Sequence, residues 1–171
     1  MPNAMKAYVR HVERVNRFFG RFAMYLVFVM MGILFWSTVS KNHPDLNPSL
    51  WTLEMAQFTM VAYYLLGGPY SMQLGEHVRM DLLYGTWSDR TKAWVDSLTV
   101  VFLLVYLVLL LWGGIASSTY ALEYGERSYS AWRPYMWPIK VIATFGIFLM
   151  LLQAVAELFK DIAKARGEPI S

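Results

Sequence analysis

A dense group of titratable side chains lies in the short segment GEHVRMD, which separates two long apolar stretches of the chain. Side chains of these types serve elsewhere as general acids, general bases and metal ligands. Here no nucleophile–base pair and no metal-ligand spacing accompanies them, and polar and apolar residues alternate along the segment. We therefore interpret it as a structural loop motif that contacts a neighbouring subunit, formed by Glu76, His77, Arg79 and Asp81. In this interpretation Arg79 and Asp81 pair at the membrane surface, where an unpaired charge is costly.

The sequence contains few residues that could bind a cofactor. Haem ligation requires His or Met inside a helical bundle, and the three histidines, His11, His43 and His77, all fall outside the long apolar stretches. The absence of cysteine excludes disulfides and thiolate metal sites. We expect no cofactor, no metal site and no enzymatic activity.

The elements that must position the polar residues are apolar helices. Hydrophobic residues make up 57% of the 171 residues and charged residues 16%, whereas a soluble domain carries about a quarter charged residues. Long stretches free of charge lie between Arg21 and Lys41, between Glu54 and Glu76, and between Asp96 and Glu123, and a fourth, from Pro134 to Ala156, contains only Lys140. Each is long enough to cross a hydrocarbon core of about 30 Å as a helix. The sequence predicts an all-α membrane protein, a single domain over residues 1–171, with four transmembrane helices at about 22–41, 50–72, 92–120 and 135–160.

The N-terminal segment, residues 4–20, has two different faces. Basic residues recur at helical spacing, and apolar residues recur at the same period on the opposite side. This pattern is typical of an amphipathic helix that lies in the membrane interface; the alternative is a helix whose apolar face packs on a partner. The interfacial basic face consists of Lys6, Arg10, Arg14, Arg17 and Arg21.

The Lys and Arg residues outside the spans favour one orientation. Most lie in the N-terminal segment, in the second loop and in the C-terminal tail, which places both termini in the cytoplasm. Because these residues flank the membrane and form no single solvated patch, nucleic-acid binding is excluded. Membrane lipids are the expected partners of the basic face.

Polar and small residues within the spans are candidates for helix contacts. Glu54 and Gln57 lie one turn apart and either meet a polar group of a partner or place Glu54 at the headgroup boundary near a helix N-terminus. Gln153 suggests an interhelical hydrogen bond. A kink or early unwinding is expected at Pro69, after Gly67 and Gly68. Pairs of small residues four apart allow a second helix to approach closely: Gly113 with Ser117, and Gly114 with Ser118.

Two segments resemble a known family. The stretch GEHVRMDLLY, after the second of four spans, is similar to the hallmark of the small membrane subunit of tripartite ATP-independent periplasmic (TRAP) transporters, the DctQ type. The segment GERSYSAWRPYMWPIKVIATFGIFLMLLQAVAEL resembles the end of the same subunit. The resemblance covers nearly the whole chain. It implies that His77, Arg79 and Asp81 form the family's loop motif and that Glu126 and Ser128 belong to its periplasmic loop, where they contact a partner.

The resemblance also implies a function. Transporters of this family import carboxylates and related organic acids across the bacterial inner membrane, driven by a sodium or proton gradient. A periplasmic substrate-binding protein delivers the substrate to a large membrane transport subunit (DctM type), and the small multi-pass subunit braces the large one. Two alternatives are the quinone- or haem-binding membrane anchor of a respiratory oxidoreductase and a small transporter that acts alone as an oligomer.

Overall fold

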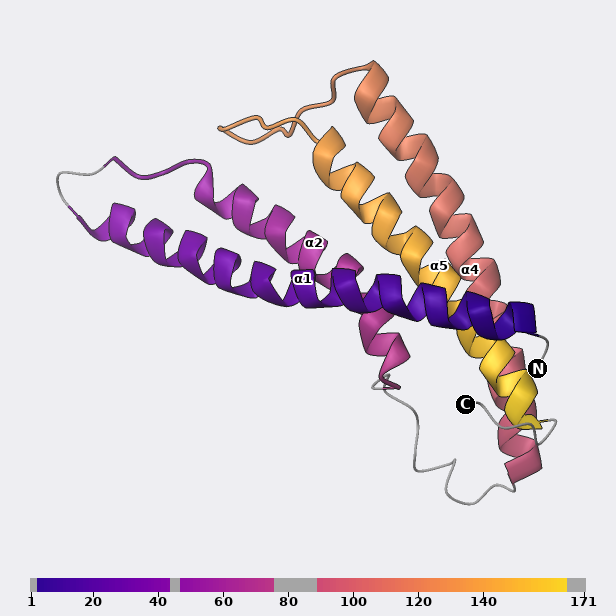
Figure 1. Cartoon of the computed structure of the whole chain (residues 1–171). Helices are drawn as coiled ribbons and strands as arrows, with labels where there is room; N and C mark the ends of the chain where they lie inside the picture. The colour runs from indigo at the N-terminus through magenta and orange to yellow at the C-terminus, as the bar shows by residue number, and fades with distance from the viewer. Residues whose placement is uncertain (1–2, 44–46, 76–88, 166–171) are drawn as a thin grey trace.

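The computed structural model describes residues 3–43, 47–75 and 89–165 of the chain. Four helices make up this part, α1 (Asn3–Asn42), α2 (Thr52–Gln73), α4 (Asp89–Glu123) and α5 (Trp137–Ala165), and it contains no strand beyond an isolated bridge. The predicted all-α architecture is therefore confirmed for the described residues. The chain folds as two helical hairpins, α1 with α2 and α4 with α5, which cross each other and diverge toward their connecting loops (Figure 1).

The first helix differs from the prediction. The expected interfacial helix at 4–20 and the expected span at 22–41 form one continuous helix, α1, which is about 60 Å long at 1.5 Å per residue. The charge pattern changes at Arg21, but no proline lies between Asn3 and Asn42 to end the helix. A change of surface polarity alone does not interrupt backbone hydrogen bonding.

The apolar face of the N-terminal half of α1 is covered by α5. Val12 is buried, the Tyr8 ring meets the Phe159 ring edge-on at 5.8 Å between centroids, and Phe19 meets Phe145 in the same way at 5.1 Å. α5 thus covers the part of this face at Tyr8, Val12 and Phe19, whereas Phe22 is exposed, and the position of the segment in the membrane interface stays a prediction. The side chains of Arg10, Arg14, Arg17 and Arg21 are exposed, and that of Lys6 is half-buried.

The crossing of α2 and α5 depends on a proline and a glycine. Pro69 has no N–H, so the carbonyl of Leu65 lacks the usual donor four residues later. This carbonyl lies against Gly146 of α5, where an added Cβ would come within 2.7 Å of the Leu65 oxygen. Of the kink or early unwinding predicted at Pro69, the unwinding does not occur, since α2 continues to Gln73, and the kink stays a prediction. The proline removes the donor that usually bonds this carbonyl, and the glycine allows a second backbone to approach it.

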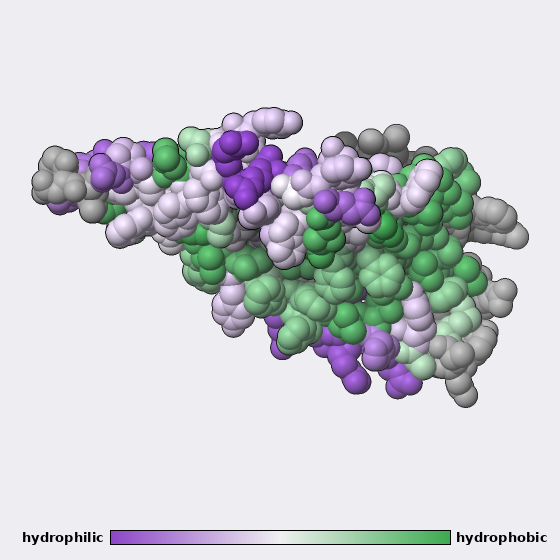
Figure 2. Space-filling view, turned by 90° about the horizontal axis from the view of Figure 1, so that it is seen from above, coloured by the Kyte–Doolittle hydropathy of each residue, from purple (hydrophilic) through white to green (hydrophobic). Residues whose placement is uncertain are grey.

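Three helices are long and apolar enough to cross a membrane. They cover Met5–Asn42 of α1, Leu98–Glu123 of α4 and Trp137–Ala163 of α5. In the described part of the chain α2 is not among them, because Glu54, Gln57 and its tyrosines lower its mean hydropathy. Large apolar side chains of α4, such as Phe102 and Trp112, are exposed, and apolar residues cover much of the face seen in Figure 2. Apolar surface of this extent indicates contact with lipid or with another protein.

Candidate functional site

The loop motif lies outside the described residues. Glu76, His77, Arg79 and Asp81 all fall in the segment 76–88, so the expected pairing of Arg79 with Asp81 stays a prediction. The other candidate residues lie on described helices and loops, where their surroundings can be compared with the expectations.

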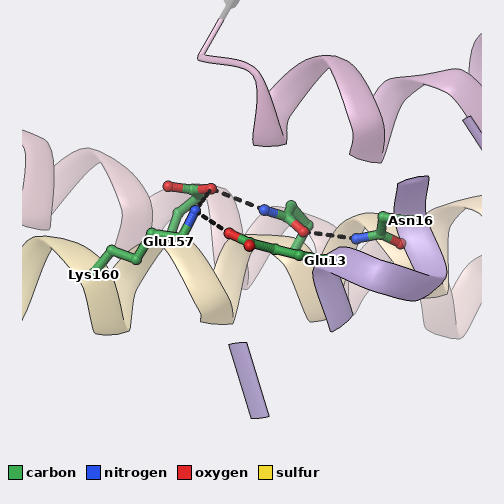
Figure 3. A network of polar contacts seen from close by, with 5 residues as sticks. Glu13, Asn16, Glu157 and Lys160 are labelled. Atoms are coloured by element: carbon green, nitrogen blue, oxygen red, sulfur yellow. Dashed lines mark hydrogen bonds and ion pairs between the residues drawn. The ribbon is translucent and has the colours of Figure 1, made fainter. Parts of the chain in front are cut away.

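The most extensive polar contact in the described part of the chain joins α1 to α5 (Figure 3). Asn16 Nδ2 donates a hydrogen bond to Gln153 Oε1 at 2.7 Å, and Gln153 Nε2 donates to Glu157 Oε1 at 2.8 Å. Lys160 Nζ then lies 2.8 Å from Glu157 Oε1 and 2.6 Å from Glu13 Oε1. The residues are three or four apart on each helix, which places them on facing sides. We call this group the α1–α5 polar cluster: Glu13, Asn16, Gln153, Glu157 and Lys160.

Burial makes the amide pair of this cluster energetically important. Asn16 is 1% exposed and Gln153 is fully buried. Removing one partner of a buried hydrogen bond costs about 1–3 kcal/mol, more than the net gain of about 1 kcal/mol from making it. The pair therefore fixes the relative position of α1 and α5 along their axes, because a shift of either helix separates the two amides.

Sequence reasoning found one half of this pair. Gln153 was expected to form an interhelical hydrogen bond, and Asn16 of α1 is its partner. Asn16 was not predicted, because it lies between Arg14 and Arg17, whose spacing indicates the basic face. It is the one uncharged amide on an otherwise apolar face, between Val12 and Phe19 at helical spacing, and this position was the available signal.

A cluster of hydroxyl groups joins α1 to α2 near their connecting loop. Thr52 Oγ1 donates to Ser37 Oγ at 3.0 Å, and Ser49 Oγ donates to Thr52 Oγ1 at 3.2 Å. Ser40 Oγ lies 3.0 Å from Ser49 Oγ. Ser37, Ser40 and Thr52 are buried. These hydrogen bonds satisfy polar groups at the end of the hairpin without introducing a charge.

Glu54 and Gln57 have different surroundings. Gln57 is exposed, whereas Glu54 is half-buried, and its Oε2 is buried with no hydrogen-bond partner among the described residues. The expected contact of the two residues with a partner stays a prediction.

Glu126 and Ser128 make contacts within the chain, in the loop between α4 and α5. Glu126 forms an ion pair with Lys140, and its carbonyl accepts a hydrogen bond from Met136 N at 2.9 Å. Ser128 N donates to Pro134 O at 2.9 Å. These bonds close the loop over the start of α5, so the side chain of Glu126 already has a partner. Its predicted contact with another subunit is not tested by this arrangement.

The two pairs of small residues on α4 are used differently. Ser118 Oγ lies 2.9 Å from Thr144 Oγ1 of α5, and a Cβ at Gly114 would lie 3.0 Å from the same oxygen. Gly113 has no atom within 4 Å of an added Cβ, and Ser117 is exposed. One pair therefore serves the contact of α4 with α5, and the other lies on the outer surface of α4.

The polar side chains described above form contacts between helices. Within the described ranges no three His, Asp or Glu side chains are arranged to hold a metal ion. The hydrogen bonds and ion pairs join helices and close loops within the chain, so the arrangement fixes the geometry of long apolar helices.

Comparison with known proteins identifies the family. The family model described as "Tripartite ATP-independent periplasmic transporters, DctQ component" matches residues 30–164. The curated proteins give no match, and neither do the solved structures. The match confirms the resemblance of the loop and C-terminal segments, and with the apolar helices it supports a multi-pass membrane protein. Because the match covers well over half of its residues, the chain belongs to the DctQ component family of TRAP transporters.

Proposed function

We propose that this chain is the small scaffold subunit of a TRAP transporter that imports organic acids across the bacterial inner membrane. Its partners are a large membrane transport subunit of the DctM type and a periplasmic substrate-binding protein. Membership of the DctQ family is the observation that carries the proposal. Substrate binding and ion-gradient coupling then belong to the large subunit, while this chain braces it.

The distribution of charge supports a bracing role. A path for an organic acid or a cation leaves ionisable residues at mid-membrane depth, and the charge-free stretches of this sequence leave almost none there. The contacts between its helices are of the kind that holds a fixed shape, namely the close approach of Gly146 to Leu65 and the buried pair of Asn16 and Gln153. A subunit that braces a moving neighbour requires such rigidity and a large apolar surface.

The orientation follows from the positive residues. With both termini in the cytoplasm, the loops at 43–51 and 124–136 face the periplasm, on the side from which the binding protein approaches. The exposed arginines of α1, Arg10, Arg14, Arg17 and Arg21, then lie at the cytoplasmic leaflet, where each attracts anionic lipid headgroups by about 1 kcal/mol.

Co-purification with the large subunit tests this proposal. The tagged chain is expressed with the large subunit and the binding protein, extracted in mild detergent and purified. We expect the large subunit to co-purify with it in a fixed ratio, and we expect cells that lack this chain to lose organic-acid uptake. Purification of the chain without the large subunit, together with unchanged uptake in its absence, would contradict the proposal.

A further inference from the structure

The loop between α4 and α5, residues 124–136, has the backbone of a short hairpin. Ser128 N donates a hydrogen bond to Pro134 O at 2.9 Å. Met136 N donates to Glu126 O, also at 2.9 Å, so the two arms of the loop run side by side. Figure 1 shows that the loop extends to the side of the start of α5 and does not continue the axes of the two helices. These bonds make the loop an ordered element with a defined direction.

Side-chain contacts hold the arms of this loop in place. The Arg127 guanidinium carbon lies 4.2 Å from the centroid of the Tyr135 ring, a cation–π contact, and Arg127 also donates to the Tyr135 hydroxyl. Glu126 forms an ion pair with Lys140 of α5. The first contact joins the two arms and the second joins the loop to α5, so the loop is fixed relative to that helix.

The turn of the loop, residues 129–133, exposes aromatic side chains. Its backbone is held by a polar contact, since Arg133 N donates to Ser130 Oγ at 3.2 Å. Tyr129 is fully exposed and Trp132 is 41% exposed. Neither side chain forms a ring contact or a hydrogen bond within the part of the chain that the structure describes. The contacts that shape the turn therefore leave both side chains available to a surface outside the chain.

The loop joins the ends of two candidate membrane spans. The span of α4 ends at Glu123 and that of α5 begins at Trp137, so both ends of the loop lie at the same face of the membrane. Tyr120, Tyr124 and Trp137 are exposed at these helix ends. Trp and Tyr concentrate where hydrocarbon meets water, because each has an apolar ring and one polar N–H or O–H group. The turn therefore lies beside a helix end at which the sequence already places residues typical of the membrane interface.

We infer that the turn 129–133 anchors this loop in the phospholipid headgroup layer beside α5, with the rings of Tyr129 and Trp132 at the boundary between headgroups and acyl chains. Arg133, exposed on the same turn, is suited to a lipid phosphate. A stable protein interface buries about 800 Å² on each partner, over about 20–30 residues, which this turn does not supply. Lipid requires only an apolar ring with a polar end. The inference requires that the chain spans a membrane, and it is independent of the transported substrate and of the large subunit.

Nitroxide spin labels on single cysteines test the depth of the turn, because the chain has no cysteine of its own. Ala131→Cys places the label between the two aromatic residues and leaves both of them intact, while Val105→Cys on α4 and Asn47→Cys in the loop before α2 are the lipid and water controls, all at exposed positions. The full chain is placed in phospholipid vesicles, and collisions of each label with oxygen and with a water-soluble nickel chelate are measured. We expect the accessibility to nickel at Ala131→Cys to be several-fold lower than at Asn47→Cys, and the accessibility to oxygen to be lower than at Val105→Cys. Equal nickel accessibility at Ala131→Cys and Asn47→Cys would overturn the inference.

Removal of the aromatic side chains tests whether they hold the turn in lipid. Tyr129→Ser and Trp132→Ser are introduced together in the Ala131→Cys chain, and Tyr64→Ser, at an exposed position of α2, is the control. We expect the double substitution to raise the nickel accessibility of the label several-fold, and we expect Tyr64→Ser to leave it unchanged. No rise in the double variant would overturn the anchoring role. A Val105→Cys label that stays inaccessible to nickel in the double variant shows that the helices remain in the membrane; otherwise the Ala131→Cys label beside the intact aromatic residues decides the question.

Addition of the proposed partner proteins distinguishes lipid from protein as the surface that the turn meets. The Ala131→Cys label is measured in vesicles with this chain alone, with the large subunit, and with the large subunit and the binding protein. We expect low nickel accessibility in all three samples. A label that is accessible in the chain alone and becomes protected only when one of the proteins is added would overturn the inference in favour of a protein contact.

Discussion

The two halves of α2 have the same kind of apolar stripe but different neighbours. Toward Gln73, α2 meets α5 so closely that the Leu65 carbonyl lies against Gly146. Toward Thr52, the same stripe leaves Val61 exposed, and the helix is held to α1 through the hydroxyls of Ser37 and Thr52. The comparison teaches that apolar periodicity specifies a face, whereas small residues specify where another helix of the same chain covers it.

The largest expected change in the free energy of unfolding comes from a larger side chain at Gly146, where α2 and α5 cross. Gly146→Leu places a branched side chain where even a Cβ would lie 2.7 Å from a backbone oxygen, so α2 and α5 must separate. We expect a loss of about 3 kcal/mol or more in the free energy of unfolding, since overpacking forces backbone shifts. Thermal unfolding in detergent, followed by tryptophan fluorescence, measures it.

Gly113→Leu is the matched control for this variant. Gly113 lies within α4 and has no atom within 4 Å of an added Cβ, so the larger side chain meets open surface and replaces a poor helix former. We expect it to be neutral or slightly stabilising. Equal destabilisation by both variants would mean that α2 and α5 do not cross at Gly146.

The next largest change in the free energy of unfolding is expected from substitutions in the α1–α5 polar cluster. Asn16→Leu or Gln153→Leu leaves one buried amide without its partner, which costs about 1–3 kcal/mol in the free energy of unfolding. The double variant removes both polar groups, so its cost is expected to be smaller than the sum of the two single costs. A double-mutant cycle in denaturing detergent measures the coupling, and strictly additive costs would show that the two amides do not interact.

The smallest effect is expected at the contact of α4 with α5. Ser118→Ala removes the hydrogen bond to Thr144, which contributes about 0.5–1.5 kcal/mol. Ser117→Ala changes an exposed residue one position earlier and is expected to have almost no effect. Thermal unfolding measures the midpoints of both variants. A lower midpoint for Ser118→Ala than for Ser117→Ala would show that Ser118 lies on the side of α4 that packs within the chain and that Ser117 lies on its outer side. A larger effect at Ser117 would reverse that assignment.

The helices could be predicted from the sequence because charge-free stretches and loop residues determine them locally. The continuity of α1 was missed, since its basic residues mark a change of surface and not a helix end. A kink or early unwinding was expected at Pro69, but the approach of Gly146, 77 positions away in the sequence, to the Leu65 carbonyl was not predicted. The ion pair of Glu126 with Lys140 was not predicted. Such pairings depend on which helices come together, and no local pattern encodes that.

Transport by reconstituted membranes tests whether this chain carries the substrate or only braces the large subunit that carries it. Proteoliposomes containing this chain alone, the large subunit alone, or both together are given an ion gradient, the binding protein and a radiolabelled organic acid. We expect uptake only when both membrane subunits are present, with no flux above empty liposomes for this chain alone. Gradient-driven uptake by liposomes that contain only this chain would contradict it.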